Sequence, residues 1–442
     1  MRGRNGWMRC QLNRNIAFTT SHLESYCIAK WEPIIYDTMV VAAAVEFADK
    51  SLRRSKMSWP REFELVIPVH QPSHWSSAVV SDALHDALNF LTGDIWTIEF
   101  CKRKRSVMAP EQGTFDIPSN MKAVIPFSEG LDSRCVAGLL GREMGDALIR
   151  VRLGSQARDG KALRRARQPF TSIPYDLWAP KGQFVESTAR SRGFKFAVIS
   201  GLAAYLVKAG QIIVSESGQG ALGPALVTVG QSYEDYRSHP LFTERMERFF
   251  QALFHHKVRF SFTQLWNTKA ETLRRFVEEC GEGTSWERTW SCWQQNRHVG
   301  VEGKKRQCGI CAACLLRRLS IHAAGLNERK ETYVWENLSA REFYLGAARA
   351  FDSEKITKAL REYAIAGALH LEHMAHLRAS PASAGTLSLC AFQVSQSLGL
   401  AESDVRSKLD RLLAQHEKEW KDFMKSLGKS SFLNKWARGD RS

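Results

Sequence analysis

Apolar residues recur in two different periods near the start of the chain, and the two periods predict an alternation of helices and strands. Residues 39–48 and 79–91 carry apolar positions at helical spacing. Residues 63–69 and 95–100 are short runs of strong strand formers, bounded by polar and turn residues. No constellation of reactive side chains accompanies them, so we expect residues 1–116 to form an accessory α/β domain.

A strand, a polar loop, a helix and a second strand then follow one another. The strands are expected at residues 121–127 and 147–151. This order is typical of a βαβ unit, whose strands are parallel. A helix at 192–208 and a strand at 212–214 continue the pattern. We therefore predict a doubly wound α/β domain with a parallel sheet over residues 117–325, with ligands bound at the carboxyl ends of its strands.

The last part of the chain has a helical pattern. Leu409, Leu412 and further apolar residues recur at steps of three and four, which predicts a helical region over residues 326–442. The longest apolar stretch, residues 196–214, is interrupted by polar residues such as Lys208. It therefore predicts a buried helix followed by a strand, and no membrane span.

Composition and charge narrow the environment and the partners. The 442 residues carry a formal net charge of +16, which favours acidic partners such as nucleotides, nucleic acid or an acidic protein. The N-terminus is rich in Arg but shows no apolar run with a cleavage site, so no secretory signal is expected. Ten cysteines, three of them within seven residues, then indicate reduced thiols in a cytoplasmic protein.

A loop with several hydroxyl groups directly follows the first strand of the α/β domain. Its residues are Ser128, Glu129, Gly130, Leu131, Asp132 and Ser133. A helix start offers backbone N–H groups and the positive end of the helix dipole to an anion. Gly130 permits close approach of a phosphate, and Ser128 and Ser133 supply further donors. A six-residue string can also occur by chance, so its position after a strand is what predicts a phosphate site.

Four cysteines in the second half of the chain have the spacing of a metal site. They are Cys292, which precedes the next by sixteen positions, and then Cys308, Cys311 and Cys314 in a C-x2-C-x2-C arrangement. Thiolates at this spacing surround one ion, and four of them form a closed structural zinc site. An iron–sulfur cluster is the alternative. Cys280 and His298 are spare candidate ligands.

The loop at residues 128–133 resembles the S-G-G-x-D-S loop of the PP-loop ATP pyrophosphatases. The resemblance implies that ATP is cleaved between its α and β phosphates, that an oxygen of the substrate is adenylated, and that Mg²⁺ neutralises the phosphates. Glu129 departs from the family pattern, which has Gly at this position. A second Gly-rich segment, residues 215–220 with Gly218, resembles the later loop that closes the nucleotide site. A surface loop is the alternative reading of that segment.

The cysteine segment is similar in detail to the zinc segment of QueC, the 7-cyano-7-deazaguanine synthase. The similarity is carried by residues 289–292 (T-W-S-C) and residues 308–317 (C-G-x-C-x-A-C-x-x-R). Residues 268–271 match the T-K-x-E stretch of the same family, and the resemblance covers roughly residues 120–325. The long flanks resemble the extended QueC-like proteins of bacterial antiviral defence operons, the QatC type among them.

This resemblance implies a reaction and roles for three residues. ATP adenylates the carboxylate of 7-carboxy-7-deazaguanine, and an amine displaces AMP. Asp132 would orient the metal or the loop, while Arg192 and Lys269 would face the pyrophosphate or the carboxylate. Arg192 and Lys269 could equally be surface charges. A defence-type relative is expected to transfer the deazaguanine to an amine of a protein from the same operon.

Two other functions remain open from the sequence. An RNA-modifying PP-loop enzyme, of the thiouridine or lysidine synthase type, would suit the net charge, although the detail around Cys292 favours the deazaguanine branch. A scaffold that has lost its activity, marked by Glu129 and held together by zinc, is the non-enzymatic reading. His370 and His373 lie on one helix face and could bind a metal, but helix packing is the favoured explanation.

Overall fold

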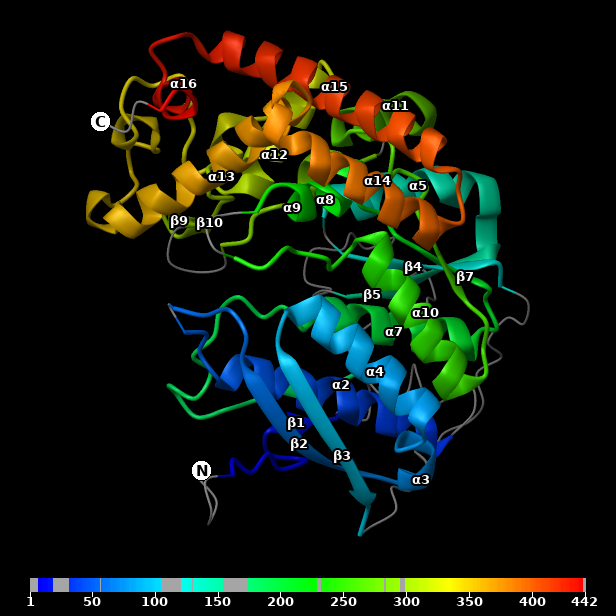
Figure 1. Cartoon of the computed structure of the whole chain (residues 1–442). Helices are drawn as coiled ribbons and strands as arrows, with labels where there is room; N and C mark the ends of the chain where they lie inside the picture. The colour runs from blue at the N-terminus through cyan, green and yellow to red at the C-terminus, as the bar shows by residue number, and fades with distance from the viewer. Residues whose placement is uncertain are drawn as a thin grey trace. The chain divides into compact units, whose positions relative to one another are not determined.

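The computed structural model describes residues 7–18, 32–55, 57–104, 121–128, 130–153, 174–228, 232–281, 284–294 and 299–439 (Figure 1). The chain divides into two compact units. The first contains residues 1–128, 140–214 and 231–263, and the second contains residues 129–139, 215–230 and 264–442. Each unit is therefore assembled from segments that are distant in sequence. The division into three domains at residues 116 and 325 remains a prediction.

The first unit begins with two parallel strands packed against helices, as the sequence predicts. The elements are α2 (Pro33–Ser51), β2 (Glu62–Val69), α3 (Pro72–Trp75), α4 (Ala78–Thr92) and β3 (Ile95–Lys102). Phe63 of β2 lies opposite Trp96 of β3, and their rings stack with centroids 4.2 Å apart. Most of the apolar stripe of α4, including Leu84 and Leu88, is buried, whereas Val79 at its start is exposed. The alternating and helical periods thus form one shared core.

The same unit contains a four-stranded parallel sheet in the order β5-β4-β7-β8. Its strands are β5 (Leu148–Arg152), β4 (Ala123–Phe127), β7 (Gln211–Ile213) and β8 (Arg259–Ser261). Helix α7 (Arg192–Leu206) packs on the first three strands and α10 (Pro240–Phe254) packs on β8. The parallel sheet is confirmed, whereas the assignment to a doubly wound PP-loop fold stays a prediction. Neither α10 nor β8 was predicted, and β8 has only three residues, too few to show a period.

The second unit is mostly helical, which confirms the predicted helical C-terminal region. Helix α5 (Leu131–Met144) starts in it, and its other helices are α8 (Gly218–Ala221), α9 (Gly223–Leu226), α11 (Lys269–Cys280), α12 (Ala312–Ala323), α13 (Lys358–His376), α14 (Ala384–Leu398), α15 (Glu402–Leu427) and α16 (Phe432–Ala437). One short antiparallel pair, β9 (Gly300–Val301) with β10 (Lys304–Lys305), also belongs to this unit. A second pair, β1 (Ile16–Ala17) with β6 (Asp176–Leu177), belongs to the first unit.

The start of α5 packs against α11 inside the second unit. Leu131, Cys135 and Leu139 form an apolar cluster with Leu273 and Phe276 of α11. This packing brings the loop at 128–133 into the same unit as the T-K-x-E stretch, although the two are far apart in sequence. Over the part of the chain that the structure covers, no helix combines the length and apolarity needed to cross a bilayer.

Candidate active site and metal centre

The T-K-x-E stretch forms the first turn of helix α11. Thr268 precedes the helix, and its side-chain oxygen accepts the N–H of Glu271 at 3.2 Å. In return, the carboxylate of Glu271 accepts the N–H of Thr268 at 2.8 Å. This reciprocal capping box satisfies two N–H groups that a helix start otherwise leaves unpaired. It therefore fixes the backbone on both sides of Lys269, which is the first residue of the helix.

Lys269 is paired with Asp132, which joins the two predicted catalytic residues in one contact. The Nζ of Lys269 donates to Oδ2 of Asp132, and both side chains are nearly excluded from solvent, with 9% and 12% exposed. Asp132 belongs to the first turn of α5, within the predicted phosphate loop. The pair thus connects the loop at 128–133 to the start of α11.

The charge of Lys269 is maintained in spite of its burial. Removal from water favours the neutral amine, but the nearby carboxylates of Asp132 and Glu216 oppose this and raise the pKa of Lys269 above its ordinary value. Lys269 is therefore a permanent cation at neutral pH. An ammonium group has three N–H donors, so it can bind an anionic ligand while it donates to Asp132.

The other residues of the predicted phosphate loop play different parts. The side chain of Leu131 is buried in the apolar cluster with α11, so only its backbone could meet a ligand. Ser133 is also buried, and its hydroxyl donates to the carbonyl of Gly130 at 3.1 Å. Ser128 ends the preceding segment, directly after β4. Glu129 lies outside the residues that the structure describes.

The strand order of the sheet favours a ligand at the end of β4. The chain runs from β4 to β5 on one side and then returns to β7 on the other side. Ligands of open parallel sheets bind at such a reversal, at the carboxyl ends of the strands. Ser128 follows β4 at this edge. Arg192 is exposed at the first residue of α7, in the first unit, and its role as a cation that faces the pyrophosphate or the carboxylate of the substrate remains a prediction.

Gly218 stands where no larger residue fits. A Cβ built on it would lie 2.1 Å from the backbone oxygen of Leu265 and 2.4 Å from Cδ2 of Leu412. Its N–H donates to the carbonyl of Asn267 at 3.1 Å, next to the start of α11. The second Gly-rich segment is therefore packed against the T-K-x-E turn instead of forming a loose surface loop. A direct contact of Gly218 with nucleotide stays a prediction.

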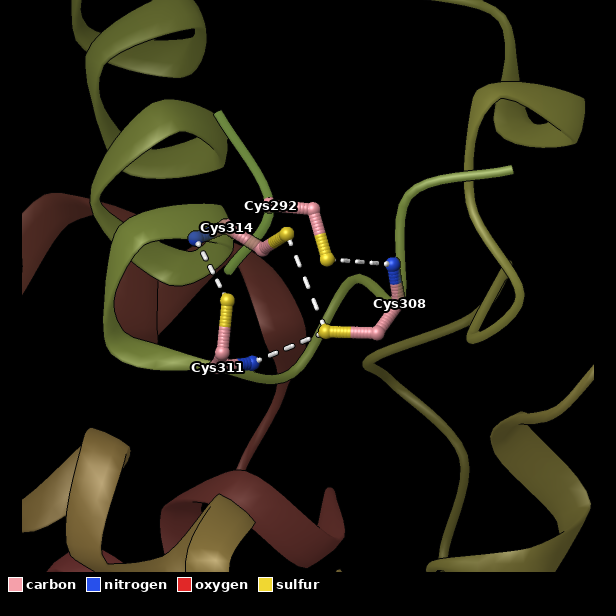
Figure 2. Close-up of side chains that lie close together, drawn as sticks. All are labelled: Cys292, Cys308, Cys311 and Cys314. Atoms are coloured by element: carbon pink, nitrogen blue, oxygen red, sulfur yellow. Dashed lines mark hydrogen bonds between the residues drawn. The ribbon is translucent and has the colours of Figure 1, made fainter. Parts of the chain in front are cut away.

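The four predicted metal ligands converge on one point in the second unit (Figure 2). The sulfur atoms of Cys292, Cys308, Cys311 and Cys314 all lie within 4.8 Å of one another, and all four residues are buried. In the part of the chain that the structure describes, this is the one group of three or more potential metal-binding side chains. The spacing read from the sequence therefore does bring the four thiols together.

Backbone N–H groups donate hydrogen bonds to the sulfur atoms, which favours the negatively charged thiolate form. Three successive bonds link the cluster to its own backbone: Cys308 N to Cys292 Sγ (3.2 Å), Cys311 N to Cys308 Sγ (3.3 Å) and Cys314 N to Cys311 Sγ (3.4 Å). Gly309 has φ of +86°, which allows the tight turn between the ligands. The cluster ends in helix α12, for which Cys311 is the N-cap.

The donor set fits a zinc ion. Tetrahedral bonds of about 2.3 Å from zinc to sulfur place the sulfur atoms roughly 3.8 Å apart, which is the distance between Sγ of Cys308 and Sγ of Cys314. A four-iron cluster holds its thiolates further apart, because each one binds a different iron. Hydrogen bonds from the other three thiols lower the pKa of Cys292, while burial raises the pKa of Cys308 and Cys314.

Two buried side chains that we did not single out as functional hold the Cys292 segment in place. Gln307 accepts the N–H groups of Ser291 and Cys292 at 2.8 and 3.2 Å. Arg317 donates to Thr289 Oγ1 at 2.5 Å and to Glu328 at 2.6 Å. Arg317, the Arg that follows the last cysteine in the family pattern, therefore has a structural role: it anchors the segment that contains Cys292, the ligand most distant in sequence.

The spare metal candidates that the structure describes do not join the cluster. Cys280 ends helix α11, where it packs with its apolar neighbours. His370 is largely buried and its Nδ1 lies 3.1 Å from the carbonyl of Val227, so packing is the better explanation for this side chain. His298 falls outside the described residues.

Comparison with known proteins finds a match for the part of the site that lies in residues 218–325. Residues 218–325 match the model of the family described as queuosine biosynthesis protein QueC. The matched segment contains the Gly218 turn, the T-K-x-E helix start and all four cysteines, so the predicted QueC likeness is confirmed there. The loop at 128–133 lies outside it. Neither curated proteins nor solved structures provided a match.

Proposed function

We propose that this chain is an ATP-dependent enzyme of the QueC type that activates the carboxylate of a 7-deazaguanine by adenylation. The observation that supports the proposal most directly is the buried pair of Lys269 and Asp132. It joins the T-K-x-E turn of the matched segment to the loop that resembles a PP-loop. The sequence match and the phosphate-loop resemblance, which cover different residues, thus meet in one contact.

The proposed chemistry needs positive charge at two places. A carboxylate is a poor electrophile, and transfer of AMP to its oxygen, with release of pyrophosphate, supplies a better leaving group. An amine then forms a C–N bond and AMP departs. Lys269 provides a fixed ammonium for the phosphates or the carboxylate. Asp132 holds that ammonium in place, and the first N–H groups of α5 offer an anion site.

Two ions complete the proposal. Mg²⁺ would neutralise the phosphates, with Asp132 as the candidate ligand in the loop. Zn²⁺ would be bound by the four cysteines, where it has no open position and serves to hold the Cys292 segment against α12. The roles assigned to Lys269 and Asp132 do not require the zinc ion to contact ATP or the carboxylate.

We further propose that the acceptor is an amine of a partner protein from the same operon, in antiviral defence. The support for this is the extent of the chain beyond the matched residues 218–325. The positive net charge of +16 favours an acidic partner. Ammonia as acceptor, leading to the amide and then the nitrile, is the simpler alternative.

Pyrophosphate release tests the enzymatic proposal. Full-length protein is incubated with ATP, Mg²⁺ and 7-carboxy-7-deazaguanine, with and without the proteins of its operon. We expect release that depends on the acid and falls about 100-fold in Lys269→Met and in Asp132→Asn, because each variant removes a positioned charge. Lys435→Met, a partly exposed lysine of α16, is the matched control and should retain full activity.

The products distinguish the acceptors. Mass spectrometry of the operon proteins would show a covalent deazaguanine if a protein amine is attacked, whereas released nitrile would indicate the plain synthase. Zinc-loaded protein that releases no pyrophosphate with any of these additions would favour the scaffold. Release that requires RNA in place of the deazaguanine would favour an RNA-modifying enzyme.

A further inference from the structure

One face of helix α15 is turned toward the start of α11. The side chains that reach this turn, or Gly218 and Gln219 beside it, recur at helical spacing and are Arg411, Leu412, His416 and Glu419. They contact residues that the proposed function uses or that lie beside them. Helix α15 itself is outside the segment that matches the QueC family. Both helices belong to the second unit.

A chain of hydrogen bonds runs from α15 to the backbone of Lys269. Nδ1 of His416 lies 2.8 Å from Nε2 of Gln219, and Oε1 of Gln219 accepts the N–H of Lys269 at 2.8 Å. Nε2 of His416 lies 3.0 Å from the carbonyl of Leu371. A carbonyl can only accept, so the ring proton resides on Nε2 and Nδ1 accepts from the amide of Gln219. His416 thereby turns the oxygen of Gln219 toward Lys269.

Glu419 orients the side chain of Thr268, the residue before Lys269. Its Oε1 accepts the hydroxyl proton of Thr268 at 2.7 Å. A hydroxyl has one proton, so the lone pairs of Thr268 are left facing the N–H of Glu271, which they accept at 3.2 Å. Arg411 also binds the carboxylate of Glu271, with one contact of 2.9 Å. The capping box is thus oriented from outside by α15.

The contacts of His416 and Glu419 are enclosed, whereas the side chain of Arg411 is half exposed. His416 and Thr268 have no exposed surface, Gln219 is 2% exposed and Glu419 is 4% exposed. Buried polar groups keep their partners because an unpaired group loses the free energy of its hydration without replacement. The geometry around Lys269 is therefore tightly determined, and it depends on Glu419, which lies 151 positions downstream of Thr268.

We propose that His416 and Glu419 are positioning residues, which hold the first turn of α11 so that Lys269 is aligned for the reaction. The inference rests on the proposed function, because neither residue is assigned a chemical step. It makes the C-terminal helical region a required part of the site. The matched segment alone would then lack the bonds that orient Gln219 and Thr268.

A pair of substitutions at His416 separates positioning from stability. In His416→Asn, the side-chain oxygen takes the place of Nδ1 and still accepts from Gln219, but the ring is lost together with its bond to Leu371. In His416→Phe, the ring volume is kept but the acceptor is lost. The Asn variant should therefore be destabilised at least as much as the Phe variant, and yet it should keep Lys269 in position.

Two measurements on the full-length, zinc-loaded protein test the proposal. We expect His416→Phe to lower kcat for pyrophosphate release about tenfold, with the KM for ATP changed less than about twofold, since alignment is lost and binding is not. Hydrogen exchange of the Lys269 amide should become about tenfold faster. His416→Asn should match the wild type in both. Equal losses of kcat in the two variants, or unchanged exchange in His416→Phe, would overturn the proposal.

Glu419 offers an independent pair. Glu419→Gln keeps an acceptor for Thr268 and should retain kcat, whereas Glu419→Leu should lose it about tenfold and should speed exchange at Glu271. The exchange measurement needs no turnover. A wild-type protein that releases no pyrophosphate would therefore remove the proposed function, while the exchange rates would still decide whether α15 holds this turn.

Discussion

The metal centre and the Lys269 site differ in how far along the chain their parts are spread. The cysteine ligands lie between residues 292 and 314, and their N–H to sulfur bonds come from the same residues. Lys269 is paired with Asp132, which is 137 positions away, and its helix start is oriented by α15. The metal centre, which is formed by residues close in sequence, lies wholly within the segment that matches the family model. The Lys269 site does not, because packing brings in Asp132 and α15 from outside that segment.

The largest expected effect concerns the metal centre. Replacing Cys308 by Ser removes one of four buried ligands, and a structural zinc site contributes about 10 kcal/mol or more to folding, so we expect loss of zinc and a fall of at least about 3 kcal/mol in the free energy of unfolding. Zinc content and chemical denaturation measure this. Cys280→Ser, outside the cluster, should keep its zinc. Full zinc occupancy in the Cys308 variant would contradict the four-thiolate site.

The second prediction concerns the Lys269 site and the effect of low pH on His416. Burial lowers the pKa of His416 to about 4, below the value of about 6.5 in an unfolded chain. Its folded pKa is depressed, so the stability it contributes is present above pH 6.5 and is lost as the pH falls toward 4. The expected slope is about 1.4 kcal/mol per pH unit. His416→Asn should lack this component in denaturation curves between pH 6.5 and 4. Parallel curves for variant and wild type would contradict buried, neutral His416.

A smaller effect is expected at Gly218, where the chain is tightly packed. Gly218→Ala would place a Cβ 2.1 Å from a backbone oxygen, which cannot yield as a side chain does. We expect a loss of about 1–3 kcal/mol in the free energy of unfolding. Gly385→Ala in α14 has no atom within 4 Å of the new Cβ and should change stability by less than about 1 kcal/mol. Similar thermal midpoints for the two variants would refute tight packing at Gly218.

The smallest effect is expected at the exposed surface of α15. Arg378 forms ion pairs with Asp410 and Glu417 of that helix at 2.8 and 3.3 Å, in a setting open to solvent. Arg378→Ala should change the free energy of unfolding by less than about 1 kcal/mol and leave activity unchanged. A larger change, measured by denaturation, would show that α15 is held by its surface charges as well as by its buried face.

Several elements followed from short-range patterns. The periods of residues 63–69 and 95–100 predicted β2 and β3, and the run at 121–127 predicted β4 within a parallel sheet. The cysteine spacing predicted the cluster. The three-residue strand β8 was missed, because a period cannot be read from so few residues. The roles assigned to Arg192, Ser128 and Gly218 stay predictions.

The sequence by itself determined what depends on neighbours within a few turns of chain. It specified the strand and helix periods and the four thiols, because each of these follows from spacing along the backbone. Only the tertiary structure decided which distant groups meet. It paired Lys269 with Asp132, and it placed His416 and Glu419 behind the same turn. These contacts arise because buried polar groups need hydrogen-bond partners, and packing supplies those partners from distant parts of the chain. A local sequence pattern contains no information about them.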